Sequence, residues 1–264
     1  MAEGVATRGT TARRWDAPFA LVGAYLALLV LAAVLLPCPN PETHGMRLAL
    51  CLLAVEAAGL AVVVPFLAAR GCAESGWRAR WAVVALPALA MGLGSLVAIA
   101  AAVRGAVGLA AIAWAQVFLL SFGVLLAAAT GALWRAGLRA ATAQAAATAL
   151  GTLMLGQVFL ANGPIEAAGA STRIFAVNAV LWTNPWLLAG GSILQADPLR
   201  SEHLYEWSVI VYYGFRYPAS GFSAAWARAL ALAGVYAACA ALLAAIGWAC
   251  GRRRGPGSVR SVDN

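Results

Sequence analysis

The stretch IFAVNAVLWTNPWLLAGGSILQA, residues 174–196, is long enough to cross a membrane but is interrupted at its centre by Asn184-Pro185. Proline removes a backbone N–H and clashes with the preceding helical turn, and it pushes the residue before it out of the helical region. The two pieces that remain, about residues 174–183 and 186–195, are each half of the roughly 20 residues that a helical crossing needs. We therefore expect a re-entrant helical hairpin here; the alternative is an ordinary span kinked by proline.

The remainder of the chain consists of long apolar runs that predict transmembrane helices. The 264 residues are 63% hydrophobic and 11% charged, whereas about 25% of the residues of soluble domains are charged. Apolar and polar residues do not alternate along these runs, as they would in a membrane β-barrel. We expect an all-α polytopic membrane protein with six transmembrane helices plus the hairpin before the last span. The predicted spans are about 17–36, 47–69, 81–103, 109–134, 140–161 and 223–249.

The arginines predict how these spans are oriented, because cytoplasmic loops carry an excess of basic residues. With both termini cytoplasmic in a cell inner membrane, the main arginine groups lie inside, at 8–14, 70–80, 135–139 and 252–254. A seventh span at 174–196 would put the last group outside. The first apolar stretch is longer than a signal-peptide core, so we expect it to be retained. We expect one transmembrane domain over 1–251, with an external re-entrant and interfacial region at 162–222, and a cytoplasmic tail at 252–264.

The segment after the hairpin predicts an amphipathic helix on the external surface. Asp197-Pro198 has the form of a helix start, with a capping residue followed by proline at the first helical position. Tyrosine and tryptophan are frequent in this segment, as they are at membrane–water interfaces. Apolar residues recur at helical spacing, at Leu204, Trp207, Val211 and Phe215.

The chain contains few residues of the types that catalysis or cofactor binding needs. Its two histidines, His44 and His203, fall in predicted loops, and neither a CxxC pair nor a P-loop motif occurs. Haem or zinc chemistry between membrane helices needs histidine on a helix. We therefore expect no enzyme activity, no cofactor and no metal site. The net charge of +8 is spread over span ends rather than gathered in a basic patch, so we expect no nucleic-acid binding.

Glu56 is the one acidic residue near the middle of a predicted span. An ionisable side chain at that depth is costly and is a functional candidate by default. Two interpretations remain open: a carboxylate on a transport path, which carries a proton, and a protonated side chain that ties two helices together. In the fifth span, Gln144, Thr148 and Thr152 recur every four residues and share one face. That face predicts helix–helix contact more readily than a substrate path.

Several stretches, together with this layout, resemble the permease subunits of type 2 ABC transporters. The stretch SFGVLLAA, residues 121–128, falls in the inner half of the fourth span, and Arg135 and Arg139 lead into an Ala-rich fifth span. Asn184-Pro185 falls in the outer hairpin, and ESG at 74–76 falls where that family has a cytoplasmic element between spans two and three. The resemblance covers most of the chain, but none of its stretches is an invariant signature.

The resemblance implies a permease subunit that moves an unidentified substrate with energy from a separate P-loop ATPase subunit. A second permease subunit, identical or different, would enclose the path with it. The implied path residues are Asn184 and Pro185, beside Glu56. The implied ATPase-docking residues, in the loop at 70–80, are Arg70, Glu74, Arg78 and Arg80.

Two features depart from the family: Thr11–Asp16 is short for an N-terminal amphipathic helix, and the loop at 70–80 is brief for a coupling helix. Two other functions stay open. One is a secondary transporter driven by protons through Glu56, and the other is a membrane scaffold that transports nothing.

Overall fold

The computed structural model describes residues 20–31, 41–72, 77–103, 105, 107–200, 208–213 and 215–252. These residues form helices and connecting turns, and this part of the chain contains no β-strand. Five helices are long and apolar enough to cross a membrane, which is the build of a multi-pass membrane protein. They are α2 (Pro41–Gly71), α3 (Trp77–Val103), α4 (Leu109–Arg135), α5 (Ala140–Leu160) and α10 (Ala225–Arg252).

These five helices correspond to the second to sixth predicted spans. The first predicted span, 17–36, is represented by the shorter apolar helix Ala20–Leu31, and its remaining residues lie outside the described part. The largest difference in bounds is at α2, which begins at Pro41, inside the predicted loop 37–46. Proline is well suited to the first position of a helix because its missing N–H has no intrahelical partner there.

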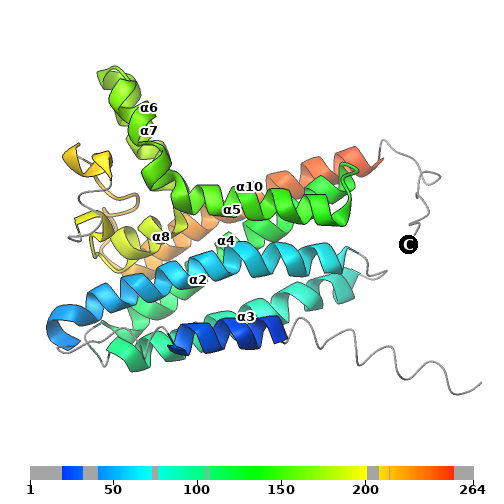
Figure 1. Ribbon diagram of the computed structural model, residues 1–264, viewed down its shortest axis with the longest axis horizontal. Helices are drawn as coiled ribbons and strands as arrows, with labels where there is room; N and C mark the ends of the chain where they lie inside the picture. The colour runs from blue at the N-terminus through cyan, green and yellow to red at the C-terminus, as the bar shows by residue number, and fades with distance from the viewer. Residues whose placement is uncertain are drawn as a thin grey trace, which may run out of the picture.

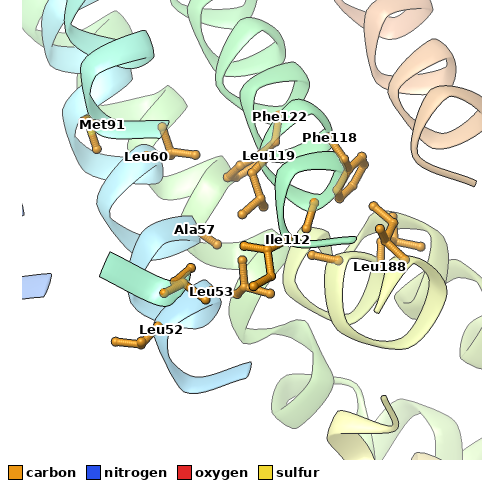
Figure 2. Packing of buried hydrophobic residues seen from close by; sticks show 14 of the residues in the cluster. Leu52, Leu53, Ala57, Leu60, Met91, Ile112, Phe118, Leu119, Phe122 and Leu188 are labelled. Carbon is orange, nitrogen blue, oxygen red and sulfur yellow. The ribbon is translucent and has the colours of Figure 1, made fainter. Parts of the chain in front are cut away.

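Helix α2 lies at the centre of the bundle, where it contacts α3, α4 and α5, and α10 packs along α4 on the other side (Figure 1). Figure 2 shows the core between them, with side chains from α2 and α3 facing those of α4. Small residues set the closest helix contacts. A Cβ added to Gly151 of α5 would meet the Ala61 Cβ at 2.9 Å, and one added to Gly247 of α10 would meet the Ala132 Cα at 2.7 Å.

The interrupted stretch begins in a helix that projects from the bundle and continues into the bundle after Asn184. After α5, the short helix α6 (Asn162–Ala167) and α7 (Ala170–Thr183) project away from one end of the bundle (Figure 1). The helical path stops at Asn184, as the sequence predicts, and resumes as α8 (Pro185–Leu187) and the π-helix η1 (Leu188–Ile193). Every residue of η1 is buried, and η1 contacts α2, α4 and α10. Figure 2 shows Leu188 of η1 close to the core side chains of α4.

The prediction of an amphipathic helix after Asp197 is wrong for the residues that the structure describes. Pro198–Arg200 (η2) and Val209–Tyr212 (η3) are short 3-10 turns, and Phe215 to Tyr217 are not helical; Leu204 and Trp207 lie outside the described part. In this segment, hydrogen bonds to other elements take the place of the hydrogen bonds within a helix. The Ser208 hydroxyl donates to the Val158 carbonyl at 3.2 Å, and the Val209 N–H donates to the Asn162 side chain at 3.1 Å.

Candidate functional site

Glu56 lies in a buried polar cluster to which four helices contribute. Its side chain is 1% exposed, and one carboxyl oxygen, Oε2, accepts a hydrogen bond from the Gln116 Nε2 of α4 at 2.7 Å. Ser95 of α3 lies beside the carboxyl. The Ser95 hydroxyl is 2.7 Å from the hydroxyl of Tyr25, which comes from the helix Ala20–Leu31. Tyr25 fits against α2 because Gly59 has no side chain: a Cβ there would meet the Tyr25 ring.

This cluster can hold a carboxyl group in either protonation state. An ionised carboxylate accepts only, whereas a protonated one also donates, and the Gln116 amide offers both a donor and an acceptor. In the observed orientation, Gln116 Oε1 is buried without a hydrogen-bond partner among the described residues. Rotating the amide would present that oxygen to a protonated Glu56. The same contacts also tie α2 to α4, so the geometry suits both of the roles that the sequence left open.

Asn184 and Pro185 start a new helix at the buried end of α7. The Asn184 Oδ1 accepts the backbone N–H groups of Trp186 and Leu187 at 3.0 and 3.1 Å, and its Nδ2 donates to the Leu155 carbonyl of α5 at 2.9 Å. Both residues are buried. The hydrogen-bonding groups of Asn184 are therefore used within the protein, where they cap the new helix and join it to α5.

Two further hydrogen bonds join the residues on either side of Asn184 to other helices. The Trp186 indole N–H donates to the Leu50 carbonyl of α2 at 2.9 Å. The Tyr236 hydroxyl of α10 donates to the Thr183 carbonyl at 3.1 Å, and the Tyr236 ring packs edge-on against Phe118. The helix break at Asn184 is thus joined by hydrogen bonds to α2, α5 and α10.

The predicted docking residues lie at the opposite end of the bundle from α8. Arg70 is exposed in the last turn of α2, with its guanidinium 5.6 Å from the centre of the Phe66 ring. Arg78 and Arg80 belong to the first turn of α3, although the placement of their side chains lies outside the described part. Glu74 is also outside it. The helices take up most of the predicted loop, which leaves residues 72–76 as the connection.

Arg228 is a functional candidate that our sequence analysis missed. It lies in the first turn of α10 and is 3% exposed. Its guanidinium donates to the carbonyls of Phe222, Ser223 and Ile193 at 2.6, 2.8 and 3.3 Å. Its Nε and the nearby Ser192 hydroxyl are buried without hydrogen-bond partners among the described residues. A charged residue inside the predicted span 223–249 was the signal that could have identified it.

The polar stripe of the fifth span does not form the main helix contact. The buried residues of α5 include Ala143, Ala147 and Gly151, which lie one position before Gln144, Thr148 and Thr152. Thr152 is exposed, and Gln144 and Thr148 are only partly buried. Alanine and glycine allow α2 to approach more closely than threonine or glutamine would, so the smallest residues take the contact.

Within the described ranges, no three His, Cys, Asp or Glu side chains are grouped so that they could hold a metal ion. The candidate site consists of a buried polar cluster around Glu56, the helix break at Asn184 and a buried cation at Arg228. In comparisons with known proteins, no protein family, no curated protein and no solved structure matches the chain.

Proposed function

We propose that the chain is the membrane-spanning permease subunit of an ABC transporter, which moves an unidentified substrate with energy from a separate ATPase subunit. The observation that carries this proposal is the difference between the two ends of the bundle. At one end, α7 stops at Asn184 and η1 packs among α2, α4 and α10. At the other end, α2, α4 and α10 finish with Arg70, Arg135 and Arg252.

Each end suits one part of the proposed function. Irregular helix at membrane depth is tolerated where protein or a water-filled path surrounds it, so the segment from Asn184 to Ile193 is our candidate for the outer end of the path. The arginine end would face the cytoplasm together with both termini, in the inner membrane. There the connection between α2 and α3 would receive the ATPase. A second permease subunit, identical or different, would complete the path. In this function the chain carries out no chemical step itself.

Capture of the ATPase tests the proposal directly. We expect the tagged chain, coexpressed with an ATPase encoded beside it, to retain that ATPase through purification in mild detergent. A chain with Arg70→Glu, Arg78→Glu and Arg80→Glu should lose it, because the docking charges are reversed. The control is Arg216→Glu, an exposed position at the other end of the bundle. Failure of the unmodified chain to retain any such ATPase would contradict the proposal.

A second function, proton-driven secondary transport, is favoured by the contact between Glu56 and Gln116. A buried carboxyl whose partner can accept or donate is what a proton-carrying site needs. In vesicles with an imposed pH gradient, Glu56→Gln should abolish substrate movement, and retained movement would rule this function out. A membrane scaffold that transports nothing would instead tolerate changes at Asn184 and Pro185 without any transport defect.

A further inference from the structure

Two adjoining cavities open where α7 meets residues 211–213 and 215–217, at the end of the bundle opposite Arg70. The first has a volume of about 410 Å³ and the second of about 380 Å³. Both are lined by Tyr213, Phe215 and Arg216, so they lie side by side. We call the two cavities together the groove, and each of them a compartment. The charges in the two compartments differ, and that difference indicates what each can bind.

The second compartment carries positive charge. Arg173 and Arg216 both line it, and Asn178 adds a neutral amide. The Arg173 guanidinium lies 5.0 Å from the centre of the Tyr213 ring and donates to three backbone carbonyls, at Ile165, Glu166 and Ala168. It is therefore held in place while it keeps its full positive charge. An arginine held on an aromatic ring in this way provides a fixed charge for an anion.

Arg216 provides a second positive charge, on an exposed side chain. Its side chain is exposed, and none of the hydrogen bonds or ion pairs among the described residues involves it. The planar guanidinium has five N–H donors, which match two oxygens of a phosphate or carboxylate group. The carboxylate in the groove belongs to the first compartment, where Asp197 accepts the Tyr217 hydroxyl at 2.7 Å. An anion is therefore attracted to the second compartment, away from Asp197.

Apolar surface continues from this cationic compartment along α7. Ile174 lines the compartment and is 64% exposed, and the neighbouring Phe175 is 74% exposed. Helix α7 projects from the bundle (Figure 1), so this surface has no cover from the described part of the chain. Positive charge next to exposed apolar side chains fits a ligand with an anionic head and a hydrocarbon tail. Soluble phosphate would use the charge but leave the apolar surface unoccupied.

We propose that the groove formed by Arg173, Arg216 and the exposed face of α7 binds the headgroup of an anionic membrane phospholipid. The phosphate would lie between the two guanidinium groups, against Tyr213 and Phe215, and one acyl chain would lie along Ile174. This binding does not depend on the transport function and would place α7 at the membrane surface.

Native mass spectrometry of the purified full chain tests the assignment. The protein is titrated with phosphatidylglycerol, with phosphatidylcholine of the same acyl chains, and with inorganic phosphate. We expect the first lipid to bind several-fold more tightly than the second, and Arg216→Gln to weaken it by about fivefold, which corresponds to one basic residue near a charged membrane surface. Arg216→Lys should retain most of the binding, and Arg139→Gln, at the other end of the bundle, should change nothing.

Three outcomes would overturn the inference. Equal affinity for the two lipids would show that the charge of the headgroup has no role. An equal loss of lipid affinity in Arg216→Gln and Arg139→Gln would show that this groove is not the binding site. Competition by inorganic phosphate at the same concentrations as the lipid would assign the groove to a soluble anion. Arg216 is the tested position because its exposed side chain can be replaced without disturbing the fold, whereas Arg173 also holds the end of α6.

Discussion

Replacing Gln116 by leucine isolates the contribution of its hydrogen bond to Glu56. The two atoms are 2.7 Å apart, both side chains are at least 95% buried, and leucine has a similar volume, so little cavity is created. An unsatisfied buried acceptor costs about 1–3 kcal/mol, while hydrogen bonds between membrane helices contribute about 0.6 kcal/mol on average and up to about 1.7 kcal/mol. We expect the free energy of unfolding to fall by about 1–2 kcal/mol.

A double-mutant cycle separates the bond from other effects of these substitutions. Glu56→Leu alone leaves the Gln116 amide without a partner and should also destabilise the protein. The double variant replaces both polar groups by apolar ones, which is often nearly neutral. The sum of the two single effects should therefore exceed the effect of the double variant by at least about 1–2 kcal/mol, measured by reversible unfolding in mixed micelles. Additivity within about 0.5 kcal/mol, as found for independent sites, would refute this account of the cluster.

The same variants decide between the two roles of Glu56. If the carboxyl only ties α2 to α4, the double variant should recover both stability and transport. If it carries protons, the double variant should be stable but inactive in vesicles with a pH gradient. Measuring stability and transport on the same preparation keeps these outcomes distinct.

Three further predictions concern the packing of the bundle, each measured as thermal stability in detergent. Gly247→Ala should destabilise by about 1–3 kcal/mol, because its Cβ would lie 2.7 Å from the α4 backbone, whereas Gly234→Ala, with open space around it, should stabilise by up to about 1 kcal/mol. Asn184→Ala should cost about 0.5–2 kcal/mol through the lost helix cap; an equal cost for the exposed Thr172→Ala would contradict that explanation. Arg228→Met should cost about 1–3 kcal/mol because three carbonyls lose a charged donor, and unchanged stability would show that these bonds contribute nothing.

Proline alone did not determine where the helices break, and the structure shows what else was needed. Pro65 lies inside α2 and Pro87 inside α3, and both helices continue through them, whereas α7 stops before Pro185. The residue before Pro185 is Asn184, whose side chain accepts the next free N–H groups and so begins a new helix. Val64 and Leu86 precede the other two prolines and have no side-chain acceptor. The asparagine–proline pair could therefore be recognised from sequence.

The partners of Glu56 could not be recognised in the same way. Glu56 was visible as a charge in an apolar run, but Tyr25, Ser95 and Gln116 are ordinary residues for their segments and are 31 to 60 positions away from it in sequence. They meet because of the angles and rotations at which four helices pack, which apolar runs do not specify. The prediction of a helix after Asp197 failed for a related reason. The apolar spacing of that segment suits a helix, but hydrogen bonds to Val158 and Asn162 determine its path.

The hydrogen bonds of Arg228 affect how parts of this protein can move relative to one another. Its guanidinium bridges Ile193, at the end of η1, and Phe222, just before α10. A hydrogen bond from a charged donor contributes about 1.5–3 kcal/mol, and pulling η1 away from the start of α10 would break the bond from Arg228 to the Ile193 carbonyl. A motion of the bundle that keeps this bond would therefore move η1 and the first turn of α10 together.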